Sequence, residues 1–168
     1  KQNKRDLSPL LKTATPHPGK AVYCTESSNP AFDKGLLNKE LLAQAQPYIE
    51  AKQGKTFYFD IRNTDRSVGA MLSGAIADVH GDQGMAADPI KAHFSGTAGQ
   101  SFGVWNAGGV ELTLTGDAND YVGKGMAGGS IAVRPPIGSA FRSHEASIIG
   151  NTCLYRATGG KLFPAGRA

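Results

Sequence analysis

Two consecutive stretches of the chain share one frame of glycine and alanine: FSGTAGQSFGVWNAGGVELT at residues 94–113 and LTGDANDYVGKGMAGGSIAV at residues 114–133. At an offset of 20, the identical pairs are Gly96/Gly116, Ala98/Ala118, Gly103/Gly123, Ala107/Ala127, Gly108/Gly128 and Gly109/Gly129. A constant period near 20 residues is typical of a solenoid, whose repeats bury their apolar sides against each other. The unit is too short for a pair of helices, so it predicts one coil of a parallel β-helix.

The glycine frame extends on both sides of these stretches. Gly69 and Gly74 repeat the five-residue spacing of Gly103 and Gly108, and a fourth, imperfect copy begins at Ile149. Glycine suits the corners of stacked coils because it tolerates positive φ and lets backbones approach closely. The sequence therefore predicts that all these glycines have a structural role.

Strand signals follow from Lys55 onward. Residues 56–61 are rich in aromatic and β-branched side chains, and the apolar residues of 110–114 alternate with polar ones, which predicts one buried and one exposed face. In the next coil the apolar residues are Ile131 and Val133, so the inward parity shifts by one position. A one-residue adjustment at the corner would restore it.

The one predicted helical region covers residues 31–54, where apolar side chains recur at helical spacing. The expected apolar face consists of Leu37, Leu41, Ala45 and Tyr48. Asn38 is a candidate N-cap, and Pro47 should end or kink the helix. We expect two parts: residues 1–54 as an arm and helical cap packed on the solenoid, and residues 55–168 as the β-helix, truncated at its C-terminal end.

Composition restricts the class of protein. A chain of 168 residues suggests one domain, and the lack of an initiator Met predicts a fragment or a processed piece. No stretch of about 18 apolar residues and no apolar signal core occur, so we expect no membrane segment. The net charge of +4 comes without a basic stripe interleaved with aromatics, which argues against nucleic-acid binding.

The cysteines predict a reducing compartment. Cys24 and Cys153 form no CxxC pair and have no His at zinc-finger spacing. We expect buried free thiols in a reducing cytosol.

Three glycine-rich segments resemble known motifs without their structural context. Residues 123–128 read GKGMAG, a literal GxGxxG, but the strand-like residues after them would not form the helix that a dinucleotide pyrophosphate needs. Residues 128–132 lack the last glycine of a nucleophile elbow. Gly160-Lys161 is followed by Leu162, not by the Ser or Thr of a Walker A loop.

Two clusters could hold a metal or act as acid and base. Asp78, His80 and Asp82 alternate and would share one face of a strand, although Gly81 and Gly84 favour a turn there. His144-Glu145 belongs to an insertion that opens at Pro135-Pro136 and interrupts the period. Loops that interrupt a solenoid often contact other molecules.

Polar side chains also gather at predicted coil corners. Asp117, Asn119 and Asp120 follow Gly116, and residues 63–66 read NTDR between predicted strands. Capping of corners and a hydrogen-bond ladder along stacked coils are the roles we expect.

The residues resemble the C-terminal domain of the large (alpha) subunit of bacterial glutamate synthase over nearly the whole chain. The matching strings are RDLSPLL at 5–11, NTDRSVG at 63–69, GTAGQSFGVWNAGG at 96–109, GDANDYVGKGMAGG at 116–129 and SHEASIIGNT at 143–152. The resemblance implies a right-handed β-helix, and hence an all-β fold. It further implies a cytoplasmic enzyme of ammonia assimilation that makes two L-glutamates from L-glutamine and 2-oxoglutarate with NADPH, FMN, FAD and iron–sulfur clusters.

In that family an amidotransferase domain hydrolyses glutamine, and a flavin-bearing barrel receives the ammonia through an internal tunnel. The resemblance implies that the β-helix domain braces these catalytic domains, and its partners are the other domains of the large subunit and the small subunit. No catalytic, cofactor-binding or metal-binding residue is therefore assigned in this chain.

The family domain continues with more coils beyond the position of Ala168. We expect the open coil end to make an isolated fragment self-associate. Two other functions stay open: a β-helix scaffold subunit of another redox complex, such as formylmethanofuran dehydrogenase, and a β-helix carbohydrate-active enzyme.

Overall fold

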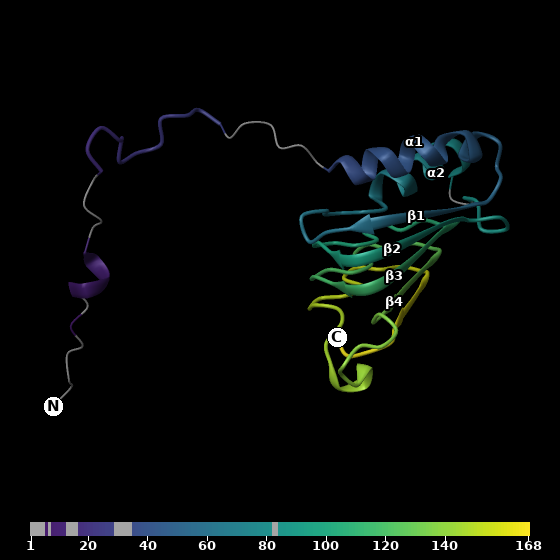
Figure 1. Ribbon diagram of the computed structural model, residues 1–168. Coiled ribbons are helices and arrows are strands. Elements are labelled where there is room, and N and C mark those ends of the chain that lie inside the picture. The colour runs from purple at the N-terminus through teal and green to yellow at the C-terminus, as the bar shows by residue number, and fades with distance from the viewer. Residues whose placement is uncertain (1–5, 7, 13–16, 29–34, 82–83) are drawn as a thin grey trace. The chain divides into compact units, whose positions relative to one another are not determined.

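The computed structural model describes residues 6, 8–12, 17–28, 35–81 and 84–168. The chain divides into two compact units, residues 1–32 and residues 33–168. The first unit contains a short 3-10 helix, η1 (Ser8–Leu11), whose residues are all exposed. The strands and α-helices of the described residues all belong to the second unit (Figure 1).

The second unit is built on one five-stranded sheet in which all neighbouring strands are parallel (Figure 1). The strands lie in sequence order: β1 (Lys55–Ile61), β2 (Ile90–Ala98), β3 (Val110–Ala118), β4 (Ser130–Arg134) and β5 (Lys161–Pro164). The helices α1 (Leu36–Glu50) and α2 (Ala70–His80) pack on each other at the β1 end of the sheet. A second 3-10 helix, η3 (Ser143–Glu145), lies in the insertion between β4 and β5.

The expectation of an all-β, right-handed parallel β-helix is wrong. The described residues form an α/β fold with a single parallel sheet and two α-helices. A β-helix requires further strands in each coil, whereas here the chain returns from one strand to the next through turns or, between β1 and β2, through α2. Apart from the pairs between these five strands, the described residues form only two isolated bridges, Ala118–Ile149 and Ser147–Arg167.

Left-handed backbone conformations explain why the return segments are turns. Positive φ angles recur at alternate positions, namely residues 101, 103 and 105, residues 121, 123 and 125, and residues 152, 154 and 156. A left-handed conformation at every second residue does not fit a strand. Hydrogen bonds between successive turns hold this conformation, because Gly103 N–H donates to Val68 O and Gly123 N–H donates to Phe102 O, both at 2.9 Å. The glycine frame marks stacked turns.

The strand register confirms both the 20-residue period and the predicted adjustment. Ala92 of β2 pairs with Leu112 of β3, an offset of 20. Leu112 in turn pairs with Ile131 of β4, an offset of 19. The change in offset places Ile131 and Val133 in the same inward rows as Leu112 and Leu114. All four side chains are at most 1% exposed, so the core is continuous across the adjustment.

Helix α1 has the predicted apolar face but different ends. Leu37, Leu41 and Ala45 are buried as expected, and Ile49 is buried beside the partly exposed Tyr48. The helix begins after Gly35, whose φ is 98°, so Asn38 is not its N-cap. The helix also continues through Pro47 to Glu50, so the prediction that it could end at Pro47 is wrong.

Asn38 instead links α1 to the segment that leads into α2. Its Nδ2 donates to Arg66 O at 3.0 Å, and its Oδ1 accepts a hydrogen bond from Gly69 N–H at 3.1 Å. The side chain is buried with both its donor and its acceptor used, which is the condition under which a buried amide is stable.

Helix α2 was not predicted. Gly69 and Gly74 have the spacing of the glycine frame, yet Gly69 directly precedes α2 and Gly74 lies inside it. Leu72 and Ile76, four residues apart, are both buried and form the apolar face of this short, alanine-rich helix. The insertion of a helix after β1 accounts for the longer spacing between the first two strands.

Candidate interaction surface

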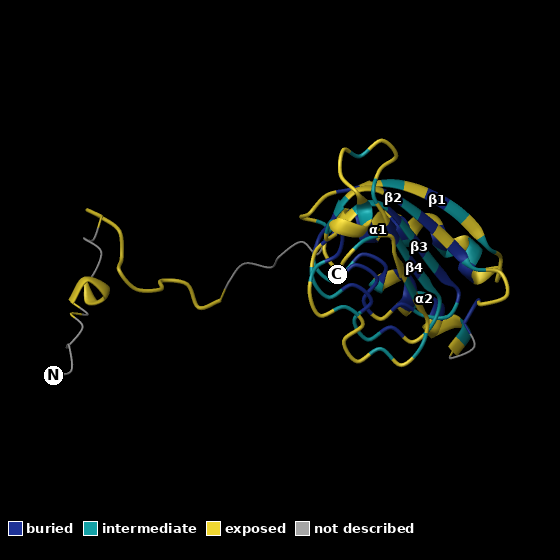
Figure 2. Cartoon of the chain, turned by 90° about the horizontal axis from the view of Figure 1, so that it is seen from below, coloured by how far each residue is buried: buried dark blue, intermediate teal, exposed yellow. Residues whose placement is uncertain are grey.

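The sheet has one exposed face. Side chains alternate along each strand, so that Phe57 and Ile61 of β1 are buried while Tyr58 is 76% exposed (Figure 2). Parallel sheets are usually covered on both faces, because their crossover connections lie against them. In this protein α1 and α2 lie at the β1 end, so the face that carries Tyr58 stays open. This face is the first candidate for a functional surface.

A row of outward side chains, called here the aromatic row, crosses the open face and has aromatic side chains on β1, β2 and β5. The register aligns Tyr58, His93, Thr113, Ala132 and Phe163 from β1 to β5. The rings of Tyr58 and His93 stack with their centroids 5.1 Å apart and their planes at 16°. Phe163, at the other end of the row, is more than half exposed. Exposed aromatic side chains are typical anchors of protein interfaces.

A groove of about 390 Å³ lies on this face beside the aromatic row. The next row of the register supplies its polar lining, with Asp60 on β1 and Arg134 on β4. Three inter-strand steps separate these two residues, roughly 14 Å. Within the described residues neither forms an ion pair, and Arg134 Nε donates to Thr115 Oγ1 at 3.3 Å. The groove therefore has a negative and a positive end.

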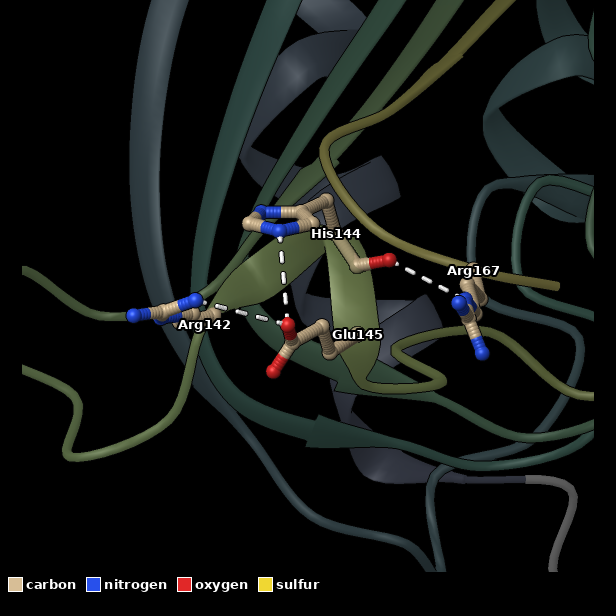
Figure 3. A network of polar contacts seen from close by, with 4 residues as sticks. All are labelled: Arg142, His144, Glu145 and Arg167. Atoms are coloured by element: carbon tan, nitrogen blue, oxygen red, sulfur yellow. Dashed lines mark hydrogen bonds and ion pairs between the residues drawn. The ribbon is translucent and has the colours of Figure 1, made fainter.

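The insertion after β4 is held by a small polar network (Figure 3). Glu145 Oε1 lies 3.6 Å from Arg142 Nη1 and 3.7 Å from His144 Nε2, and all three side chains are largely exposed. Arg167 Nε donates to His144 O at 3.0 Å, which joins the insertion to the segment after β5. The His144-Glu145 pair thus lies within the 3-10 helix η3, at the surface. Exposed ion pairs of this kind contribute little stability each.

The Asp78, His80 and Asp82 cluster does not form on a strand. Asp78 and His80 belong to α2, where residues two apart do not share a face. The Nε2 atom of His80 lies 2.6 Å from Ile49 O, so this side chain links the ends of the two helices. Asp82 lies outside the described residues. Among the residues that the structure describes, no three His, Cys, Asp or Glu side chains could hold a metal ion together.

The GxGxxG at residues 123–128 forms one of the stacked turns. Gly123 N–H donates to Phe102 O, Gly125 N–H to Tyr155 O and Gly128 N–H to Asn106 O. These amides are therefore already bonded to the neighbouring turns, and β4 follows where a dinucleotide-binding helix would begin. Ser130 likewise starts β4 and not a strand-to-helix elbow, and Lys161 starts β5.

The polar corners have the predicted capping role. Thr97 Oγ1 donates to Asp117 Oδ1 at 2.7 Å, and Asp120 Oδ1 accepts from Asn151 N–H at 2.8 Å. Asn119 Nδ2 donates to Asn63 Oδ1 at 3.2 Å, which links turns 56 positions apart in the sequence. These contacts form a ladder along the stack of turns.

The cysteines do not fit an iron–sulfur cluster, and the bonded amides above do not fit a flavin phosphate. A cluster needs about four thiolates, and the chain has two cysteines, Cys24 in the first unit and Cys153 in the second. Cys153 donates through Sγ to Gly150 O at 3.2 Å. Partial burial raises the pKa of its thiol above the ordinary value, and this outweighs the opposing hydrogen bond from the backbone of Val122.

Sequence reasoning missed the groove on the open face. Tyr58, His93 and Arg134 lie far apart in the sequence and meet only through the strand register. The usable signal was the exposed alternate positions of each predicted strand, which carry aromatic and charged side chains.

Comparison with known proteins defines the family of the chain. The family model described as "GXGXG motif" matches residues 38–168, which include the whole sheet and the stacked turns. The chain belongs to the GXGXG motif family. None of the helices in the described part of the chain is long and apolar enough to cross a membrane.

Three curated relatives are glutamate synthases. The chain is 44% identical over 164 residues to "Glutamate synthase [NADH]" of Schizosaccharomyces pombe, and the match covers 97% of the chain and 8% of that protein. It is 42% identical over 164 residues to "Glutamate synthase [NADPH] large chain" of Azospirillum brasilense, covering 97% of the chain and 11% of the relative. It is 46% identical over 142 residues to "Ferredoxin-dependent glutamate synthase" of Pyropia yezoensis, covering 84% and 9%. The chain thus spans about a tenth of the length of these relatives.

Proposed function

We propose that this chain is a non-catalytic structural domain of a glutamate synthase. In that enzyme it braces the glutamine amidotransferase and FMN-binding domains, which together make two L-glutamates from L-glutamine and 2-oxoglutarate. Its partners are the other domains of the large subunit and the small subunit, in the cytoplasm. The FMN, the iron–sulfur clusters, the FAD and NADPH belong to other parts of the enzyme.

One observation carries the proposal: the outer face of a parallel sheet is open although such faces are normally covered. The aromatic pair of Tyr58 and His93 offers an apolar anchor at the β1 edge of this face. Asp60 and Arg134 offer opposite charges on either side of the groove, which set the orientation of a partner with the reverse arrangement. A rigid, hydrogen-bonded stack of turns behind the sheet suits a bracing role.

Polar side chains that the sequence suggested as site residues make structural contacts: His80 contacts Ile49 O, and Asp117 accepts a hydrogen bond from Thr97. We further propose that residues 1–54 act as the arm and helical cap of the domain. The self-association of the isolated chain stays a prediction, which light scattering would test.

The test is binding in trans. The chain and a glutamate synthase large chain that lacks this segment are produced separately, and their affinity is measured by calorimetry. Tyr58→Ala and Arg134→Ala should each weaken binding by about tenfold, because interface anchors contribute on the order of 1–2 kcal/mol or more.

Gln44→Ala serves as the matched control. Gln44 is exposed on α1, away from the open face, and alanine suits a helix. Circular dichroism checks that all variants fold. Equal affinity of the face variants and the control would contradict the proposal that the open face binds the rest of the enzyme.

A further inference from the structure

A second hollow, of about 380 Å³, lies where the insertion meets the C-terminal ends of β2 and β3. Gly96, Thr97, Gly116 and Asp117 form its sheet side, and Pro136, Phe141 and Ile148 form its other side. In open parallel sheets, ligands bind outside the carboxyl ends of the strands, usually where the strand order reverses. The order of this sheet does not reverse, so the insertion supplies the second wall.

Hydrogen bonds fix the base of the insertion, which forms part of this wall. Arg167 N–H donates to Ala146 O at 2.9 Å, and Ile148 N–H donates to Arg167 O at 3.0 Å. The side chain of Arg167 also holds His144 O, which ties the base of the insertion to the last segment of the chain (Figure 3). Residues 144–148 of the insertion, which include part of this wall, are therefore attached to the last segment of the chain.

The lining combines an apolar wall with one charge. Phe141, Pro136 and Ile148 provide apolar surface, and Asp117 is the one charged residue among the described residues that line the hollow. Thr97 Oγ1 donates to Asp117 Oδ1 at 2.7 Å, which orients the carboxylate and leaves acceptor positions for a ligand. No Lys, Arg or His of the described chain forms an ion pair with Asp117.

We propose that this hollow binds an alkyl cation, an alkylguanidinium or alkylammonium group, with its charge on Asp117 and its stem against Phe141 and Ile148. Long cationic side chains and amines bury their methylene stems along apolar surface while the charged end keeps polar contacts. The cation is either a free small molecule or a lysine or arginine side chain of a neighbouring domain. The second source rests on the proposed bracing function.

The direct test titrates n-butylguanidinium into the full 168-residue chain and follows methyl and amide NMR shifts. Saturable shifts at Ile148, Ala146 and Asp117 in the millimolar range support the site. Asp117→Asn should weaken the binding by about tenfold, because it removes a charged hydrogen bond while its amide oxygen can still accept from Thr97. Phe141→Ala should weaken it as well, and Gln44→Ala, which changes an exposed residue of α1 outside the lining, should not.

Butanol is the neutral control ligand. Equal binding of butanol and butylguanidinium, shifts elsewhere on the protein, or an unchanged affinity in Asp117→Asn would each overturn the proposal.

The two sources are separated by adding butylguanidinium to the binding assay in trans. Competition with the remainder of the enzyme, together with weaker association of Asp117→Asn, identifies a protein side chain as the occupant. Retained binding of the probe to the assembled complex identifies a free small cation. If the chain does not associate with the remainder at all, the bracing function fails while binding of the probe to the chain alone still decides the site.

Discussion

Gly116 of β3 lies directly opposite Gly96 of β2, and the two backbones approach so closely that a side chain on Gly116 would overlap the carbonyl oxygen of Gly96. Gly96 and Gly116 are also the first identical pair of the 20-residue sequence repeat. The repeat therefore places a glycine on both strands where their backbones lie closest. Gly116 also has a φ of 150°, which L side chains rarely adopt.

Gly116→Ala should therefore destabilise the protein by about 3 kcal/mol or more, because overpacking against backbone adds to an unfavourable φ. Gly74→Ala is the matched control. Nothing lies within 4 Å of the new Cβ at Gly74, and this glycine lies inside α2, so the change should stabilise by about 0.5–1 kcal/mol. Urea unfolding measures both, and a Gly116→Ala variant as stable as the parent would contradict the register.

Lys52→Gly should stabilise the protein by about 0.5–1 kcal/mol. Lys52 follows the end of α1 with a φ of 53°, its N–H donates to Ile49 O, and Gln53 N–H donates to Tyr48 O. This is a Schellman motif, whose left-handed position favours glycine over residues with a Cβ. Lys52→Ala, which keeps the Cβ, is the control and should not stabilise. Thermal unfolding that ranks the two variants in the opposite order would contradict the assigned helix end.

Asn38→Ala should destabilise by about 2–3 kcal/mol. The change leaves Arg66 O and Gly69 N–H without the partners that hold α1 against the start of α2. Gln44→Ala on the exposed side of the same helix should be within about 0.5 kcal/mol of the parent. Hydrogen exchange of the Gly69 amide provides a local readout, and unchanged protection in Asn38→Ala would argue against the bond.

Cys153 should react with iodoacetamide more slowly than the exposed Cys24, as mass spectrometry of the native protein can show. Burial raises the pKa of the Cys153 thiol in the folded state above its value in the unfolded state. The contribution of the protonated thiol to the free energy of unfolding is therefore complete below the unfolded-state pKa and is lost as the pH rises through the folded-state pKa. Stability should therefore fall at alkaline pH, and Cys153→Ser should reduce this fall. Faster labelling of Cys153 than of Cys24 would contradict its burial.

Local patterns in the sequence predicted several features correctly. The apolar face of α1 follows from the spacing of Leu37, Leu41 and Ala45, and the change of register follows from the parity of Ile131 and Val133. Both features depend on side chains within one helix or on adjacent strands, and the spacing of apolar residues in the sequence indicates such features directly.

The fold class depended on interactions that periodicity does not record. Ser101, Trp105 and Tyr121 adopt left-handed backbone conformations, and hydrogen bonds to the neighbouring turns hold them there. Their residue types do not indicate this conformation, so the 20-residue period predicted a coil of a β-helix where the structure has one strand followed by turns. Helix α2 was not predicted because Gly69 and Gly74 repeat the glycine spacing of the turns. Only Leu72 and Ile76, four residues apart, indicate a helix there.

The bracing function is tested most directly by removing the domain from the enzyme. In a glutamate synthase that carries this chain as its corresponding segment, the glutaminase half-reaction and complete glutamate synthesis are assayed separately, with the segment present, deleted, and added back in trans. The account predicts that deletion leaves glutaminase activity detectable, abolishes its coupling to glutamate synthesis, and that the added chain restores the coupling. Full, coupled glutamate synthesis without the segment would contradict it.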